Sequence, residues 1–142
     1  MSLPDAVHAL FAAPNFAHLA TLGRDGAPYS TPIWADVRDG RVVFFARADS
    51  AHGRNMARDP RVALSVVDLE DPYRAARLRG RAHVLDLGPG RDAFVHAMAH
   101  KYTSRPYADP IADTVTVYAV EASATSAVGY SDVYAHRPGG PA

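Results

Sequence analysis

The sequence predicts a mainly β, antiparallel single domain with a few short helices. Asp25-Gly26 and Asp39-Gly40 each separate runs rich in β-branched and aromatic residues, and Asp-Gly favours the positive φ angles of tight hairpin turns. Later runs alternate apolar and polar residues at the period of a strand. With 142 residues and 48% hydrophobic content, the chain is large enough to bury the core of one domain.

The first half of the chain is predicted to form a helix followed by a three-stranded meander. Pro4 suits a first helical position, and apolar residues then recur at helical spacing. The expected segments are a helix at 4–12 and strands at 16–22, 29–37 and 41–47. Because both turns are tight, each strand is expected to pair with the next one along the chain.

The second half is predicted to form a capped helix, further strands and a longer helix. Ser50 can cap the first helix, since its hydroxyl can accept from a free backbone N–H, and Asp59-Pro60 ends it. Strands are then expected at 61–67, 74–87 and 114–121, a helix at 92–102 and a last segment at 126–134. Arg77, Arg79 and Arg81 give the strand 74–87 a basic face, for which a solvated surface and a site role weigh equally.

Composition excludes several classes of protein. The formal net charge is zero, so neither nucleic acid nor an anionic membrane is an expected partner. The chain has no cysteine, which excludes disulfides, thiolate metal sites and cysteine nucleophiles. It has no membrane-spanning apolar run and no basic signal-peptide start, so a cytoplasmic location is expected. We predict one domain at 1–135 and a flexible Pro/Gly-rich tail at 136–142.

Most patterns that could carry chemistry have a simpler explanation. His96 and His100 have the i, i+4 spacing of helical metal ligands, but they fall opposite the apolar face of their helix. Exposed surface histidines are therefore favoured, and no metal site is predicted. No G-x-S-x-G elbow surrounds Ser30 and Thr31, and no G-x-G-x-x-G follows a strand. No catalytic acid, base or nucleophile is identified.

The segment that leads into the helix after Ser50 is a candidate anion site. It joins an apolar strand to a helix start beside Arg54 and His52. The free N–H groups and the positive end of the dipole at a helix N-terminus favour phosphate. Solvated arginines on a surface helix explain the same spacing, and spacing alone favours that explanation.

Three segments resemble the flavin/deazaflavin oxidoreductase superfamily, which shares the split β-barrel of pyridoxamine-phosphate oxidase. They are FAHLATLGRDGAPYSTPIWADVRDGRVVFFA at 16–46, SAHGRNMARDPRVALSV at 50–66 and HKYTSRPY at 100–107. The branch that the chain resembles most is the small group dependent on the deazaflavin coenzyme F420. The resemblance implies an antiparallel, homodimeric FMN-binding split β-barrel, with a helix that plugs one end of the barrel.

The resemblance also implies which residues meet the cofactor. The strand 30–34 matches the family strand that lies against the tricyclic ring, and 46–55 matches the phosphate-binding segment. The cofactor-binding residues carried over are Thr31, Ile33, Trp34, Ala46, Arg47, Ser50, Ala51, His52, Arg54, Asn55 and Lys101. Family members usually have Lys or Arg where this chain has His52, and the oxidases have Arg where it has Ala51.

The function that the resemblance implies is hydride transfer between reduced coenzyme F420 and a small unsaturated organic substrate. The cofactor carries the chemistry, and the protein supplies binding, orientation and a dry pocket. Two alternatives stay open: an FMN-dependent oxidase or reductase of the same fold, and a non-catalytic flavin- or haem-binding protein, which Ala51 and His52 make credible. The expected partners are the small-molecule substrate and a second copy of the chain.

Overall fold

The strands form one seven-stranded antiparallel sheet in the computed structural model, which describes residues 2–129. They are β1 (Ala17–Leu22), β2 (Pro28–Ile33), β3 (Asp36–Arg38), β4 (Arg41–Arg47), β5 (Arg61–Val67), β6 (Arg74–Val84) and β7 (Val115–Gly129). Their order across the sheet is β2-β1-β5-β6-β7-β4-β3. The mainly β, antiparallel prediction is confirmed, and the predicted tail at 136–142 lies outside the described residues.

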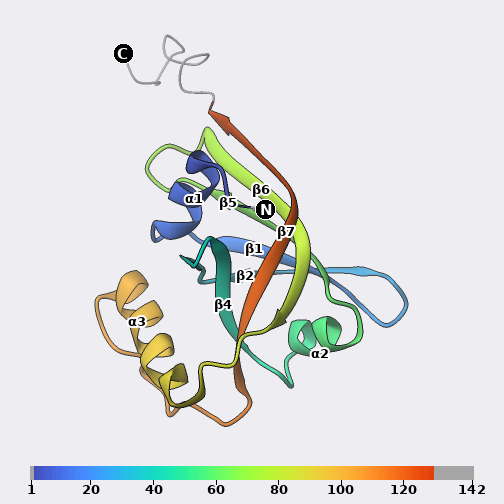
Figure 1. Cartoon of the computed structure of the whole chain (residues 1–142). Helices are drawn as coiled ribbons and strands as arrows, with labels where there is room; N and C mark the ends of the chain where they lie inside the picture. The colour runs from blue at the N-terminus through green and yellow to red at the C-terminus, as the bar shows by residue number, and fades with distance from the viewer. Residues whose placement is uncertain (1, 130–142) are drawn as a thin grey trace.

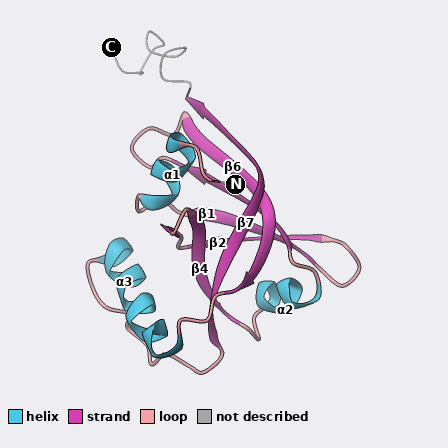
Figure 2. Cartoon of the chain, in the orientation of Figure 1, coloured by secondary structure: helices cyan, strands magenta, loops and turns pink. Residues whose placement is uncertain are grey.

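Within residues 2–129 the structure has three α-helices, which lie around the curled sheet (Figures 1 and 2). They are α1 (Asp5–Ala12), α2 (Ala51–Arg58) and α3 (Arg91–Thr103), with a short 3-10 helix at Gly88–Gly90 before α3. α1 packs against β3, β5, β6 and β7, whereas α2 packs against β1 and β4. Figure 1 shows α1 and α2 at opposite ends of the long strands β6 and β7, with α3 beside β4. None of the helices in residues 2–129 is long and apolar enough to cross a membrane.

The core lies on the inner face of the sheet. Leu19, Leu64 and Leu78 are cross-strand partners on β1, β5 and β6, and each is at most 2% exposed. Full burial of one such side chain contributes roughly 1.5–3 kcal/mol. Phe11 of α1 joins the same core at 1% exposure. The row of leucines therefore fixes the register of three neighbouring strands, because a slip by one residue would turn it to the outside.

The predicted strand at 29–37 is wrong, because the chain bends at Trp34 and Ala35. β2 pairs with β1 before the bend, whereas β3 pairs with β4 after it, at the other edge of the sheet. The predicted three-stranded meander therefore does not form. Since only two residues join strands at opposite edges, the two edges must lie close together and the sheet curls into a barrel.

Side chains of α3 hold this bend. The Tyr102 hydroxyl accepts a hydrogen bond from the backbone N–H of Ala35 at 3.0 Å and lies 2.7 Å from the carbonyl oxygen of Asn15, to which it donates. The Lys101 ammonium donates to the carbonyl oxygen of Ala35 and lies 3.3 Å from the Asp36 carboxylate. Burial lowers the pKa of Lys101, and the neighbouring Asp36 opposes that shift. The bend is thus held by contacts far apart in sequence.

The last strand is longer than predicted. The segments expected at 114–121 and 126–134 are one strand, β7, up to Gly129, and residues 130–134 lie outside the described part of the chain. A bulge shifts the pairing of β6 with β7 between Arg79 and Gly80. A Cβ at Gly80 would stand 2.1 Å from the carbonyl oxygen of Glu121, so only glycine lets the two backbones approach this closely.

We expect Tyr102→Phe to lower the free energy of unfolding by about 1–3 kcal/mol, because it removes the partner of the Ala35 N–H at the bend and of the Asn15 carbonyl oxygen. Urea unfolding followed by fluorescence measures this loss. Tyr29→Phe is the matched control, since Tyr29 is 40% exposed and its hydroxyl makes no hydrogen bond in residues 2–129. Equal stability of the two variants would contradict a structural role for the Tyr102 hydroxyl.

Candidate functional site

An aromatic pocket of about 390 Å³ lies between the β2–β3 bend, β4 and the first turn of α2. Its lining includes Phe16, Ile33, Trp34, Phe45, His52 and Tyr107. The Phe45 ring makes edge contacts with Trp34 at 6.2 Å and with Tyr107 at 5.7 Å between centroids. Flat apolar walls of this kind suit a planar conjugated ring, which can stack on or meet the edges of aromatic side chains.

β2 gives one side of this pocket a free backbone edge. Among residues 2–129 it pairs only with β1, so alternate N–H and C=O groups have no partner strand there. Pro32 lies in this edge strand, where its missing N–H costs no ladder bond, as predicted. Of the ring-contacting residues predicted, Ile33 and Trp34 line the pocket, whereas Thr31 is partly buried on β2 outside its lining.

The predicted phosphate-binding segment follows the end of β4. Its arginines, Arg47 and Arg54, already have hydrogen-bond partners within the segment. Arg47 forms a two-pronged ion pair with Asp49, with N–O distances of 2.8 and 3.0 Å. The Asp49 carboxylate raises the pKa of Arg47, and the Arg47 guanidinium lowers that of Asp49. Arg54 donates to the backbone carbonyl of Asp49. A phosphate at this position has to compete with Asp49 for Arg47.

The first turn of α2 is held tightly against the end of β4. The Ser50 hydroxyl accepts from the N–H of Gly53 at 3.1 Å and donates to the carbonyl of Arg47, so the predicted helix cap is confirmed. A Cβ at Gly53 would lie 2.3 Å from the Arg47 carbonyl oxygen. The close approach therefore requires glycine, and it fixes where the free N–H groups of α2 point.

Asn55 has a structural position. It is 6% exposed, its amide donates to the Thr21 hydroxyl at 3.0 Å, and its carbonyl oxygen accepts from Arg58. The bond to Thr21 joins α2 to β1, and the two bonds together use both the nitrogen and the oxygen of the side-chain amide. Lys101 is likewise engaged, at the bend and with the carbonyl of Phe11. The structure thus brings neither side chain to the pocket lining with a free polar group.

His52 is the polar group of the aromatic pocket. Its ring lies nearly parallel to that of Tyr29, with centroids 6.4 Å apart. Its Nδ1 is buried and has no hydrogen-bond partner among the described residues. Burial lowers the pKa of His52 below its usual 6.5. The imidazole is therefore mostly neutral at pH 7, and its buried Nδ1 is an unsatisfied polar atom within the described residues.

Sequence reasoning missed three of the pocket walls. Phe16, Phe45 and Tyr107 line the pocket but were not among the predicted site residues. The predicted Ala46, the neighbour of Phe45, is 7% exposed in the core, and the predicted Ala51 is partly buried in the first turn of α2. Strand alternation was the available signal for Phe45, because its side chain must face opposite to that of Ala46.

The two helical histidines are exposed, as predicted. His96 accepts from the N–H of Tyr107 through Nδ1 at 3.1 Å. That contact helps to hold the segment that carries the Tyr107 wall of the pocket. No cluster of three potential metal-ligating side chains occurs in the part of the chain that the structure describes.

Comparisons with known proteins agree with this fold. A family model described as pyridoxamine 5'-phosphate oxidase matches residues 3–129. Over 63 residues the chain is 41% identical to the pyridoxine/pyridoxamine 5'-phosphate oxidase of Thermosynechococcus vestitus. That match covers 44% of this chain and only 30% of the relative, so the chain spans less than a third of that enzyme's length.

Two solved structures share the fold over most of the chain. An F420 reductase is 30% identical, with a TM-score of 0.74 over 87% of this chain and 98% of that one. A haem-binding protein from Mycobacterium smegmatis is 25% identical, with a TM-score of 0.64 over 92% of this chain and 57% of that one. The predicted split β-barrel is thereby confirmed.

Proposed function

We propose that this chain, which belongs to the pyridoxamine 5'-phosphate oxidase family, transfers a hydride between reduced coenzyme F420 and a small unsaturated organic substrate in the cytoplasm. The observation that carries the proposal is the aromatic pocket, which extends from the edge strand β2 to His52 in the first turn of α2. Similarity to an F420 reductase over nearly its whole length supports a deazaflavin in this pocket.

The residues of the pocket fit such a cofactor. Trp34, Phe45 and Tyr107 offer flat walls to the tricyclic ring, and the open edge of β2 offers backbone donors and acceptors to its polar rim. The N–H groups of the first turn of α2, with Arg54 nearby, would hold the phosphate. When bound, the deazaflavin supplies the hydride. The chain's part is to orient the ring and substrate and to exclude water.

A non-catalytic flavin or haem carrier is the second candidate. The position of His52 in the lining of the aromatic pocket supports it, because a histidine nitrogen is a common axial ligand of haem iron. Similarity to the haem-binding protein from Mycobacterium smegmatis points the same way. An FMN-dependent oxidase or reductase of the same fold would use the same pocket walls.

We expect coenzyme F420 to bind more tightly than FMN or haemin, and the reduced deazaflavin to be oxidised by an unsaturated acceptor when the protein is present. Fluorescence titrations with F420 and FMN, a Soret-band titration with haemin and a turnover assay test this. Phe45→Ala should weaken ring binding, whereas Phe94→Ala, at a partly buried position of α3 outside the pocket lining, should leave it unchanged. Stoichiometric FMN or haem with no F420 binding would overturn the proposal.

We further propose that the protein acts as a homodimer with its sites at the interface. Phe16 and Tyr29 are 47% and 40% exposed beside the aromatic pocket, and a second copy would cover both. Sedimentation at micromolar concentration should give twice the chain mass of 15.2 kDa. A monomer that still binds the cofactor at full affinity would refute the composite site.

The charge on His52 sets the pH dependence of cofactor binding under this proposal. In the free protein burial lowers the pKa of His52, so the ring is neutral at pH 7.5. A bound phosphate favours the imidazolium and raises the pKa in the complex. Affinity should therefore be greatest below the free pKa and fall as pH rises through the bound pKa. The second phosphate ionisation, near about 6, partly offsets this trend on the acid side.

We expect His52→Lys to tighten binding about fivefold at pH 8, which corresponds to roughly 1 kcal/mol for a partly exposed charge-assisted contact, and to remove most of the pH dependence above neutrality. His52→Ala should bind no better than wild type at pH 6. Dissociation constants for the three proteins at pH 6 and pH 8 provide the measurement. Three similar affinities at both pH values would mean that His52 does not meet the phosphate.

A further inference from the structure

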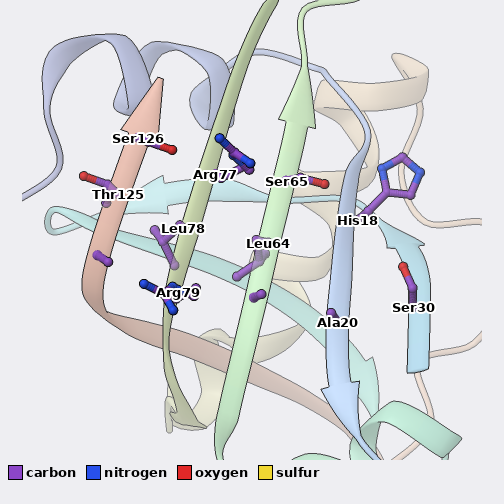
Figure 3. Close-up of a pocket in the computed structure, with 12 residues that line it drawn as sticks. His18, Ala20, Ser30, Leu64, Ser65, Arg77, Leu78, Arg79, Thr125 and Ser126 are labelled. Carbon is purple, nitrogen blue, oxygen red and sulfur yellow. The ribbon is translucent and has the colours of Figure 1, made fainter. Parts of the chain in front are cut away.

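Tyr107 is a wall of the aromatic pocket that the sheet does not hold in place. A second hollow, of about 490 Å³ on the outer face of the sheet, is lined only by residues of β1, β2, β5, β6 and β7 (Figure 3), so strand register fixes its walls. Tyr107 lies instead in the connection of residues 104–114 between α3 and β7, which contains no helix or strand. Its place in the pocket must therefore be fixed by other contacts.

Tyr107 is the point at which this connection turns inward. Among residues 103–110 it alone is partly buried, and the others are exposed. Its ring meets that of Phe45 edge to face, with centroids 5.7 Å apart. Asp49 is the main cause that raises the pKa of Arg47, and Tyr107 adds a smaller contribution. Tyr107 thus lies between the wall that suits a planar ring and the segment predicted to bind the phosphate.

His96 of α3 holds Tyr107 by its backbone. The Nδ1 of His96 lies 3.1 Å from the backbone nitrogen of Tyr107 and accepts a hydrogen bond from that N–H. No other hydrogen bond joins residues 106–111 to the rest of the described chain. Because a backbone N–H can only donate, Nδ1 must offer a lone pair, and the proton of the neutral ring is assigned to Nε2. The contact therefore requires an acceptor atom at the position of Nδ1.

The two ends of the connection are held independently of His96. Near its start the N–H of Arg105 donates to the Thr103 hydroxyl at 3.2 Å. Near its end the Arg91 guanidinium donates to the carbonyl oxygen of Ala112 at 3.2 Å. Loss of the His96 contact should therefore release the middle of the connection while both ends stay attached.

We propose that His96 is a positioning residue of the aromatic pocket, which keeps the Tyr107 ring against Phe45 as a fixed wall for a bound planar ring. A wall that is already in place lets a ligand bind without first ordering the connection. His96 is exposed on α3 and outside the pocket lining, so it acts through Tyr107 and not by touching the ligand. The proposal rests on the proposed function only for the identity of the bound ring.

Trp34 gives a readout of this wall in the free protein. It is the only tryptophan of the chain, and it lines the same pocket in edge contact with Phe45. Acrylamide should quench its fluorescence about twofold more strongly in His96→Leu than in wild type, since the loss of one hydrogen bond shifts a local equilibrium by at least about that factor. His96→Asn should behave like wild type, because the amide Oδ1 replaces Nδ1 as the acceptor.

His100→Leu is the matched control. His100 is exposed on the same helix, and its side chain makes no hydrogen bond within residues 2–129. The control should be quenched like wild type. Equal quenching of wild type and His96→Leu would overturn the proposal, and so would an equal increase in His96→Asn or in His100→Leu.

Fluorescence titrations of the same proteins with coenzyme F420, FMN and haemin connect the wall to ligand binding. The ligand that wild type binds should bind His96→Leu about two- to tenfold more weakly, the effect of one lost hydrogen bond, and His96→Asn should restore the affinity. If wild type binds no F420, the proposed function fails, and the quenching of Trp34 still decides the role of His96. Stronger quenching in His96→Leu with unchanged ligand affinity would overturn the role of this wall in binding.

Discussion

The bend at Trp34 and Ala35 is the constraint on which the rest of the structure depends. It sends the chain from one edge of the sheet to the other within two residues, and so it determines that the sheet closes. The same bend places Trp34 in the wall of the aromatic pocket, where its ring stacks on Tyr102 at 5.3 Å. The hydroxyl of the half-buried Tyr102 and the half-buried ammonium of Lys101 hold it. The closure of the sheet and the geometry of the pocket therefore both depend on the polar contacts of Lys101 and Tyr102 at the end of α3.

The proposed anion-binding end of the pocket combines a rigid backbone with adjustable charge. Ser50 and Gly53 fix the first turn of α2 against the end of β4, so its N–H groups need little rearrangement to receive a ligand. The positive side-chain charges are not directly available to a ligand. Arg47 is ion-paired with Asp49, and His52 is mostly neutral near pH 7. If the proposed phosphate binds here, exchange of ion-pair partners and protonation set its affinity more than backbone movement does.

Local signals were enough to predict most of the fold. Asp-Gly turns, the cap at Ser50 and the stop at Asp59-Pro60 act within a few residues, and each appears where the sequence indicates it. The bend was missed because residues 29–37 continue a strand pattern, and the contact that breaks it comes from Tyr102, 67 residues later than Ala35. Resemblance led to Ile33, Trp34 and His52, all of which line the pocket. It could not reveal that the side-chain amide of Asn55 is already hydrogen-bonded to Thr21 and Arg58, since those contacts depend on packing.

The strand order also bears on how the protein folds as it leaves the ribosome. The β1–β2 hairpin can form as soon as its turn has emerged, because its partners are adjacent in sequence. β4 pairs with β7 through partners such as Val42 and Val120, so its second edge stays open until nearly the whole chain has been made. Loop closure over such a separation is slow, and an apolar strand with an open edge is prone to pair with other chains. The nascent protein thus has its greatest need of a chaperone after β4 and before β7.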